Sequence, residues 1–312
     1  MEKFEVSILG CGSAMPTLRH HPSAQVVNVR DKLFLVDCGE GTQLQYRRAG
    51  LSFARIYRIF ISHLHGDHCY GLPGLLSSLE LLGRTAELHI HSPQGLEEML
   101  MPMLGQRGGE QSYAIVFHPF PTHAPTEIYS DRSVTVSTIP LHHRVPCCGF
   151  LFAEKACPPH ILRQAMERYA IPYSEVGRIK AGADFVTAGG ECIPNAQLTR
   201  PADPPRRYAY MSDTLYQPQL ADAIRGIDML YHEATYAQTE QVMAEKYHHT
   251  TALQAAQLAY AAGVGQLLLG HFSDRYRDES LLLDEALTVF PHTLLAKELT
   301  TFEVKPFDQQ PV

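Results

Sequence analysis

The sequence contains no tryptophan, no C-x-x-C cysteine pair and no apolar run of the length that crosses a membrane. A spanning helix needs roughly 20 consecutive apolar residues, so we expect no transmembrane segment. The seven cysteines are an odd number and include the adjacent Cys147 and Cys148, which favours reduced thiols over a disulfide framework. The first residues, MEKFEVSILGCG, lack the basic and apolar segments of a secretory signal. Together these absences favour a cytoplasmic protein.

A large excess of charge of one sign is lacking as well. The 26 Lys and Arg residues and the 33 Asp and Glu residues give a net charge of −7, which argues against a strongly basic surface that coats nucleic acid. Hydrophobic residues make up 45% and charged residues 19%, values that exclude a disordered or collagen-like chain. The 312 residues suffice for a buried core without disulfides or metals. Histidine, in contrast, is abundant, with 17 residues.

The order of the predicted elements indicates the fold class. Short strands such as Phe4–Leu9 dominate the first part, and the last third alternates strands such as Gln266–Leu269 with helices such as Thr251–Ala262. This order favours an α/β protein with two sheets and helices outside them, an αββα sandwich that forms one domain over residues 1–312. Weak periodicity and several Gly and Pro residues predict an insertion over about 154–206.

Two further predictions concern helices. The apolar pattern of Pro93–Leu104 predicts a helix between a strand and a Gly-rich loop. Inside the insertion, Pro159–Tyr169 is also predicted to be helical. Thr250 or Thr251 is expected to cap the helix that follows it, because Ser and Thr hydroxyls accept hydrogen bonds from the first turn.

The densest group of metal-binding side chains follows the predicted strand Arg58–Ile61, in the string HLHGDH at 63–68. Imidazole nitrogens and carboxylates suit Zn²⁺ and similar divalent ions. In an extended chain His63 and His65 point the same way, and Gly66 permits a tight turn that brings Asp67 and His68 to a second point. One ion needs only three or four protein ligands. We therefore expect two ions at this place.

More candidate ligands stand at the ends of later predicted strands. His142 and His143 follow one strand, Asp213 follows another in YAYMSDT, and His271 follows a third in LLLGHFSDRY. Ligands on successive strand ends converge at one edge of a sandwich, so we expect these residues to join the HLHGDH cluster. The residues alone leave His142 and His143 as alternatives. We interpret the remaining histidines singled out here as surface or supporting residues: His20, His21, His123, His232 and His248.

Several strings make the chain resemble a known family. H-x-H-x-D-H with downstream His, Asp and His resembles the metallo-β-lactamase superfamily, and longer strings resemble the short form of ribonuclease Z, the tRNA 3′-processing endoribonuclease. They are LGCGSAMP, DCGEGTQLQ, SHLHGDHCYGLPGLL, PLHHRVPCCGF, SDT, HEAT, HTTALQAAQLA and GHFSDRY, and they span nearly the whole chain. The string PLHHRVPCCGF aligns His143, not His142, with a ligand of the family.

The resemblance implies a ligand set and an activity. One metal is expected to bind His63, His65, His143 and Asp213, and the other to bind Asp67, His68, His271 and a bridging Asp213. The implied enzyme is a zinc-dependent endoribonuclease that removes the 3′ trailer of precursor tRNA and leaves a 3′-hydroxyl. Two Zn²⁺ ions per subunit, or Mn²⁺ or another divalent ion, would lower the pKa of a bridging water, and the resulting hydroxide would attack the phosphodiester.

The resemblance also implies roles outside the metal ligands. Asp67 is expected to accept the proton of the attacking water as well as bind metal, and Glu233 with His249 to supply the proton for the leaving 3′-oxygen. Family members are commonly homodimers that bind precursor tRNA with a protruding arm, which we place at 154–206. Three residues beside the predicted site are expected to contact RNA: Arg144, Arg275 and Tyr276.

The arm is the part that departs from the family pattern. It is only mildly basic and has no clear GPxxGKLK-like string; SEVGRIKAG at 174–182 is the nearest match. This departure motivates an alternative, a binuclear hydrolase of small phosphodiesters, sulfate esters or lactones. A non-catalytic RNA-binding protein on a degenerate hydrolase fold and a di-iron redox enzyme are two further alternatives. The complete ligand set argues against the former, and the lack of a flavin or partner domain argues against the latter.

Overall fold

The computed structural model describes residues 2–15, 17–105 and 112–307. The chain forms two compact units, which we call the insertion unit (residues 155–205) and the main unit (residues 2–154 and 206–307). None of the helices within the described ranges is long and apolar enough to traverse a membrane.

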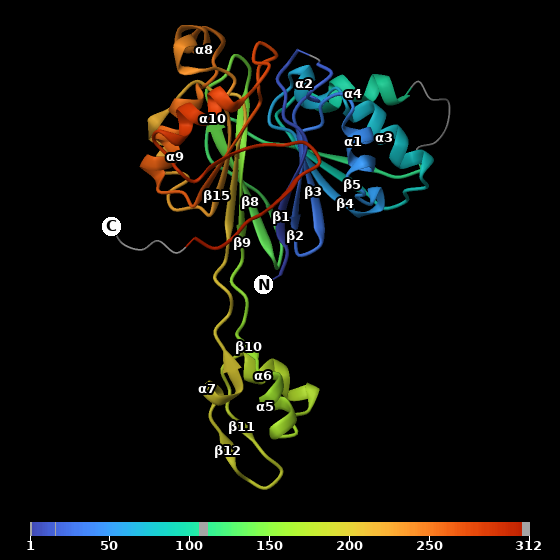
Figure 1. Cartoon of the computed structure of the whole chain (residues 1–312). Coiled ribbons are helices and arrows are strands. Elements are labelled where there is room, and N and C mark those ends of the chain that lie inside the picture. The colour runs from blue at the N-terminus through green and yellow to red at the C-terminus, as the bar shows by residue number, and fades with distance from the viewer. Residues whose placement is uncertain (1, 16, 106–111, 308–312) are drawn as a thin grey trace. The chain divides into compact units, whose positions relative to one another are not determined.

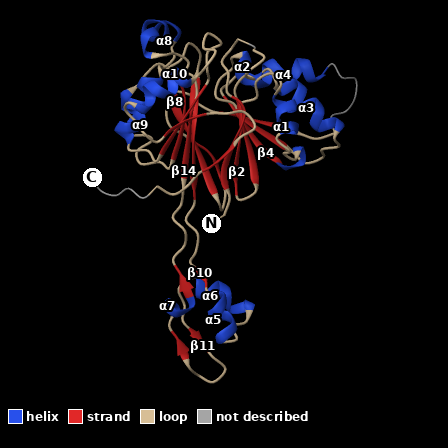
Figure 2. Ribbon diagram, in the orientation of Figure 1, coloured by secondary structure: helices blue, strands red, loops and turns tan. Residues whose placement is uncertain are grey.

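The main unit contains two seven-stranded sheets that face each other, with helices on their outer sides (Figures 1 and 2). This is the predicted αββα arrangement. In spatial order, the strands of the first sheet are β18 (Thr301–Glu303), β1 (Phe4–Gly10), β2 (Ala24–Val29), β3 (Lys32–Val36), β4 (Ile56–Phe60), β5 (Leu88–Ser92) and β6 (Ile115–Pro119). Those of the second are β17 (Thr293–Leu295), β16 (Gln266–Gly270), β15 (Met229–Glu233), β14 (Arg207–Met211), β9 (Cys147–Glu154), β8 (Val134–Leu141) and β7 (Glu127–Ser130).

Alternating side chains of the strands build the core. Phe34 and Phe60 of the first sheet point inward and meet Phe150 and Phe152 of the second, with ring centroids 5.6 to 5.8 Å apart. The opposite face of the first sheet packs on apolar residues of its helices. These helices are α1 (Thr42–Arg48), α3 (Leu72–Leu81) and α4 (Leu96–Leu104), and those of the second sheet are α9 (Ala252–Ala262) and α10 (Ser280–Leu287). Two further helices, α2 (Gly66–Cys69) and α8 (Gln241–Tyr247), lie next to the strand ends.

Parallel pairing places several strand ends at one edge. β3, β4, β5 and β6 run parallel in the first sheet, and β14, β15, β16 and β17 run parallel in the second. The carboxyl ends of parallel strands lie on the same side of a sheet. Two glycines then let the loops pack closely there: a Cβ at Gly71 would lie 2.0 Å from the carbonyl oxygen of Gly39, and a Cβ at Gly39 would lie 2.4 Å from that of Asp67. The DCGEG turn therefore contacts the HLHGDH segment directly.

The insertion unit has a small hydrophobic core of its own, formed by residues such as Ile179, Phe185 and Leu198. Its helices are α5 (Arg163–Arg168), α6 (Val176–Lys180) and α7 (Asn195–Leu198), and its strand pairs are β10 (His160–Ile161) with β13 (Thr199–Arg200) and β11 (Phe185–Val186) with β12 (Cys192–Ile193). The weak periodicity of this stretch therefore reflects short elements and not an absence of structure.

Some predicted boundaries differ from the structure. Helix α4 begins at Leu96 and not at Pro93, because Gly95 has a φ of 104°, which a helical residue does not adopt. The predicted helix Pro159–Tyr169 is split, because residues 160–161 pair with residues 199–200 as a strand before α5 begins. Thr251 is the residue that caps α9: its hydroxyl accepts the Gln254 N–H and the Gln254 side chain accepts the Thr251 N–H, which forms a capping box.

Candidate metal centre

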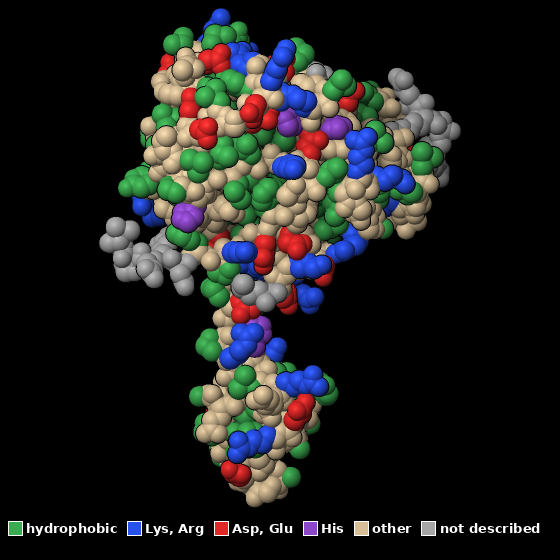
Figure 3. Space-filling view, viewed as in Figure 1, with side chains coloured by type: hydrophobic (Ala, Val, Ile, Leu, Met, Phe, Trp, Pro, Cys, Tyr) green, Lys and Arg blue, Asp and Glu red, His purple; other side chains and the backbone are tan. Residues whose placement is uncertain are grey.

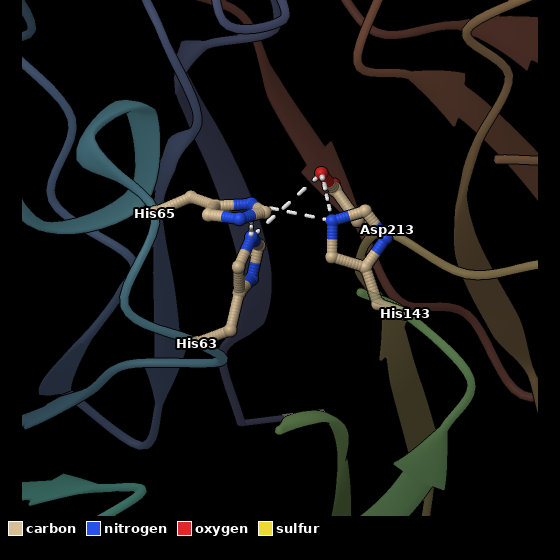
Figure 4. A group of neighbouring side chains, drawn as sticks. All are labelled: His63, His65, His143 and Asp213. Atoms are coloured by element: carbon tan, nitrogen blue, oxygen red, sulfur yellow. Dashed lines mark hydrogen bonds and ion pairs between the residues drawn. The ribbon is translucent and has the colours of Figure 1, made fainter. Parts of the chain in front are cut away.

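The first predicted ligand group comes together at the shared strand edge. His63 and His65 follow β4, His143 follows β8 and Asp213 follows β14, and the four side chains point toward one another (Figure 4). Nδ1 of His65 lies 3.1 Å from Nε2 of His63 and 3.2 Å from Nε2 of His143. The Oδ2 atom of Asp213 lies 3.7 Å from Nε2 of His63 and 3.8 Å from Nε2 of His143. All four donor atoms lie within 4.8 Å of one another.

The second predicted group lies on the other side of Asp213. Oδ1 of Asp213 is 3.4 Å from Nε2 of His68 and 3.2 Å from Nε2 of His271. Oδ2 of Asp67 is 3.4 Å from each of the same two nitrogens. Asp213 thus presents one carboxylate oxygen to each group, as a bridging ligand does.

The unpaired atoms of the site support metal binding. His68 Nε2 and Asp213 Oδ1 are buried and have no hydrogen-bond partner among the described residues, and a buried polar group without a partner is costly. Nitrogen and oxygen ligands of a tetrahedral zinc ion are separated by about 3.3 to 3.5 Å, close to the separations in both groups. Each group therefore has the donors and the spacing to hold a divalent cation.

Hydrogen bonds fix four of the imidazoles through their outward nitrogen, Nδ1 in each case. This contact sets the tautomer so that Nε2 is left to face a cation. The acceptors are Ser62 Oγ at 3.0 Å for His63, Asp37 Oδ2 at 2.7 Å for His68, the His248 carbonyl at 3.0 Å for His143 and Thr235 Oγ1 at 2.8 Å for His271.

Asp37 is a supporting residue that the sequence interpretation did not single out. It is fully buried, and besides the His68 bond it accepts hydrogen bonds from the Ser62 amide and hydroxyl and from the Tyr210 hydroxyl, at 2.6 to 2.8 Å. The available signal was its place in DCGEGTQLQ, directly after β3, which pairs with β4. Strand adjacency puts the residues that follow β3 beside those that follow β4.

The charges of the site suit a cation. Burial lowers the pKa of His143 to about 4, so this imidazole is neutral, as ligation requires. Burial opposes protonation of His68, but the carboxylates of Asp213, Asp67 and Asp37 outweigh burial and raise its pKa well above the usual value. The carboxylates around His68 therefore favour positive charge at this place, which a bound cation would supply.

Glu233 and His249 form a buried pair beside the second group. Glu233 ends β15 and is fully buried; its Oε1 atom lies 2.9 Å from Nδ1 of His249. Burial alone would lower the pKa of His249, but the Glu233 carboxylate outweighs burial and raises it to about 9. The hydroxyl of Thr235 lies 2.6 Å from Glu233 Oε2 and 2.8 Å from His271 Nδ1, so it links this pair to a predicted ligand.

A cleft of about 380 Å³ opens onto the site, and its walls include Asp67, His249 and two of the residues predicted to contact substrate, Arg144 and Arg275. The guanidinium of Arg275 pairs with Glu240 and lies 4.9 Å from the ring centroid of Tyr236. Tyr276 is not among the cleft-lining residues. Its hydroxyl donates to Glu240 and accepts the Ala237 N–H at 2.8 Å, so it joins the Glu240 side chain to the backbone of Ala237. His142 is exposed and stands outside both ligand groups.

Comparison with solved structures defines the class of protein. A metallo-β-lactamase fold protein from Bacillus subtilis aligns over its full length with 97% of this chain, at 19% identity and a TM-score of 0.68. The human short-form tRNase Z covers 96% of this chain with 99% of its own, at 25% identity and a TM-score of 0.71. The chain has the metallo-β-lactamase fold.

Comparison with curated relatives defines the family. A ribonuclease Z from Bacteroides thetaiotaomicron is 61% identical over 298 residues, which are 96% of this chain and 94% of the relative. A family model described as anti-Pycsar protein Apyc1 matches residues 4–157. The chain belongs to the ribonuclease Z family.

Proposed function

We propose that the chain is a tRNA 3′-processing endoribonuclease that binds two Zn²⁺ ions and cuts the 3′ trailer from precursor tRNA, leaving a 3′-hydroxyl. The observation that carries this proposal is the pair of donor groups that share Asp213, with His249, which Glu233 holds from behind, on the wall of the same cleft. The ribonuclease Z relatives and the human tRNase Z support the choice of substrate.

The predicted ligands divide between two cations. His63, His65, His143 and Asp213 would hold one. Asp67, His68, His271 and the second oxygen of Asp213 would hold the other. Bound there, two divalent cations supply positive charge that lowers the pKa of a water and neutralises phosphate oxygens.

The chain's own residues provide the proton transfers. Asp67 lines the cleft, and we assign it as acceptor of the proton that the attacking water loses. The leaving 3′-oxygen of the tRNA needs a proton, and His249 carries one at neutral pH because Glu233 raises its pKa to about 9. Since Nδ1 of His249 is held by Glu233, Nε2 is the nitrogen left to donate.

Arg144 and Arg275 line the cleft and are assigned as phosphate contacts. We assign Tyr276 to substrate binding as well, because its hydroxyl holds Glu240, and Glu240 in turn pairs with Arg275. On the face of the molecule seen in Figure 3, Lys and Arg side chains alternate with Asp and Glu over both units. This face of the molecule therefore offers no broad basic surface, and the proposed phosphate contacts are the individually placed cations of the cleft.

Cleavage of a labelled precursor tRNA by the full-length protein, with the cut site mapped, tests the proposal. We expect a cut after the discriminator nucleotide and a 3′-hydroxyl on the product. Asp67→Ala should abolish cleavage, whereas Asp222→Ala, which removes an exposed carboxylate, should not. Turnover of bis(p-nitrophenyl) phosphate with no cut in any precursor tRNA would favour the alternative, a small-ester hydrolase.

We also propose that the protein is a cytoplasmic homodimer. All seven cysteines are free thiols, which suits a reducing compartment. Met15 and Tyr70 are 60% and 65% exposed, and each lines a cleft together with Asp67; exposed apolar side chains gathered at one place are typical of a surface that a second copy covers. Light scattering on the purified protein should give twice the mass of one chain, and a monomer at micromolar concentration would contradict the dimer.

A further inference from the structure

A third group of metal-competent side chains lies outside the ligand set described above. Cys11 follows β1 and is fully buried, His20 is half-buried in the next loop, and Glu298 lies between β17 and β18. Cys11 Sγ is 3.4 Å from His20 Nδ1, and that nitrogen is 3.7 Å from Glu298 Oε1. The three donor atoms all lie within 4.8 Å of one another. Segments far apart in the sequence thus bring together a thiol, an imidazole and a carboxylate.

The spacing of these donors matches the requirements of zinc. Zinc binds thiolate sulfur at about 2.3 Å and imidazole nitrogen or carboxylate oxygen at about 2.0 to 2.2 Å. At tetrahedral angles these lengths place neighbouring donors about 3.4 to 3.6 Å apart. The separations of 3.4 Å between Cys11 Sγ and His20 Nδ1 and of 3.7 Å between His20 Nδ1 and Glu298 Oε1 are close to this spacing. Little movement of the side chains is therefore needed to close the group around an ion.

The outer contacts of the group resemble those that surround ligands in metal sites. A histidine ligand almost always donates its second ring N–H to a carboxylate, carbonyl or water. Nε2 of His20 lies 3.1 Å from Oε1 of Glu279, which Arg19 holds at 2.9 Å. With the ring proton on Nε2, the lone pair on Nδ1 points toward Cys11 and Glu298.

The carboxylate of Glu298 is also oriented by its neighbours. Its Oε2 atom accepts hydrogen bonds from Nδ1 of His21 at 2.9 Å and from Nε2 of Gln45 at 2.8 Å. Oε1, which accepts the His21 amide N–H, is the oxygen that faces His20. Two carboxylates, Glu279 and Glu298, therefore surround one thiol and one imidazole, and their negative charge favours a cation among them.

We propose that Cys11, His20 and Glu298 bind a zinc ion separate from the cations at Asp213. On binding, the Cys11 S–H bond breaks, the proton passes to solvent, and a sulfur–zinc bond forms; no electron is transferred. Three protein donors leave one coordination position for water. The ion would tie Cys11 and His20, and with them the loop that begins at Cys11, to the segment that precedes β18. Because Ser13, Ala14 and Met15 of that loop line the cleft, the ion stabilises one wall of the candidate active site.

Cobalt substitution in the full-length protein tests this site, because a thiolate bound to Co²⁺ gives a near-ultraviolet charge-transfer band that His and Asp ligands do not give. Cys157→Ser and Cys192→Ser are introduced first, since these two cysteines are the solvent-accessible ones. The metal-free protein is then loaded with Co²⁺. We expect the charge-transfer band and, by elemental analysis, one ion per chain more than the ions held around Asp213.

Single substitutions assign the band. Cys11→Ser should remove the band and one ion per chain, and His20→Ala, which changes a less buried residue, should do the same if Cys11→Ser fails to fold. Cys148→Ser is the matched control: Cys148 is buried in the main core and belongs to no ligand group among the described residues, so the band should persist.

Two outcomes overturn the proposal. A loaded protein without a thiolate band shows that Cys11, His20 and Glu298 form a hydrogen-bonded network only. A band that survives Cys11→Ser shows that another cysteine is the ligand. Because the groups around Asp213 contain only His and Asp donors, a failure of the proposed ribonuclease activity leaves the band unchanged, and the two proposals are tested separately.

Discussion

Two clusters of histidine rings in the main unit begin with the same H-x-H spacing but differ in their chemistry. The first is the metal centre, where His63 and His65 follow β4; the second contains His89 and His91 inside β5, with His118 on β6 beside them. The rings are equally crowded: the centroids of His63 and His65 lie 4.7 Å apart, and those of His91 and His118 lie 4.5 Å apart. The density of histidine therefore does not distinguish a metal site.

The neighbours of the rings account for the difference. In the metal centre, carboxylates of Asp67 and Asp213 stand between the imidazoles. In the strand cluster, Nε2 of His91 lies 3.2 Å from the Arg58 guanidinium and its ring stacks on Phe60. Burial, with nearby positive groups, lowers the pKa of His91 to about 3. Interleaved carboxylates attract a cation, whereas an arginine and an aromatic ring make the second cluster a neutral packing element.

Removing the shared carboxylate should have the largest effect. Asp213→Ala takes one donor from each group, so we expect both cations to be lost and cleavage to fall by about 10³-fold or more. Elemental analysis and single-turnover cleavage measure the two effects. Asp222→Ala, at an exposed carboxylate, serves as the control. Full metal retention in Asp213→Ala would show that this carboxylate is not what makes one histidine cluster bind metal and the other not.

Glu233→Gln should have the next largest effect. The amide keeps the size of the side chain but removes the charge that holds a proton on His249, so cleavage should fall by about 10²- to 10³-fold. The metal content should stay unchanged, because Glu233 belongs to neither group around Asp213. The control is Glu245→Gln at an exposed position. A parallel loss of metal would instead make Glu233 a ligand.

His249, beside the metal centre, and His91, in the strand cluster, should affect stability at opposite ends of the pH range, and the alkaline end concerns His249. The pKa of His249 is about 9 in the folded protein against an ordinary 6.5, so the folded state binds more protons between these values. The metal-free protein should lose about 2 to 3 kcal/mol of unfolding free energy as pH rises from 6.5 to 9. Urea titrations should show a smaller loss in Glu233→Gln. An equal loss in both proteins would mean that this pair does not stabilise the fold.

On the acid side, the contribution of His91 in the strand cluster can be measured by itself. The pKa of His91 falls to about 3 from an ordinary 6.5, so the unfolded state binds more protons in this range. As pH falls from 6.5 to 4.5, the protein should lose about 2 to 3 kcal/mol through this residue. His91→Gln keeps an acceptor for Arg58 but does not titrate. Its unfolding free energy should therefore fall by about 2 to 3 kcal/mol less than that of the unaltered protein over the same pH range. If the unfolding free energies of the unaltered protein and His91→Gln fall equally as the pH is lowered, His91 is not held neutral by the fold.

The smallest effect is expected for His118→Ala. His118 is half-buried and shares a 2.9 Å hydrogen bond with His89, so its loss should cost about 1 kcal/mol of unfolding free energy. Metal content should not change, and cleavage should stay within about 2-fold of the unaltered protein. His143→Ala is the contrasting variant, since it should lose metal. If both variants lose metal, the strand cluster also holds an ion.

Local sequence patterns predicted the elements whose partners are close in the chain. The helix that Thr251 caps is an example, because its signals lie within four residues of each other. Strand β18 was not predicted, since its pairing with β1 joins residues about three hundred positions apart. Strand β7 was missed as well, as its short, partly exposed pattern is weak. Such elements form because a distant strand supplies hydrogen-bond partners, which no local window contains.

The candidate site, too, could be predicted only in part from local sequence patterns. Side-chain chemistry and spacing identified which residues could bind metal, because a ligand must be an imidazole or a carboxylate whatever surrounds it. The H-x-H spacing alone does not separate His63 and His65 from the equally spaced His89 and His91, and it is the added Asp67 and His68 of HLHGDH that single out the metal centre.

The amino-acid sequence by itself therefore determined the donor atoms, the sandwich of alternating elements and the family. Only the tertiary structure decided which donors face a common point, that Asp37 and Thr235 orient the imidazoles, and that Glu233 keeps a proton on His249. The physical reason is that ligand chemistry belongs to each side chain, whereas burial, tautomer and charge depend on neighbours that folding brings from distant parts of the chain.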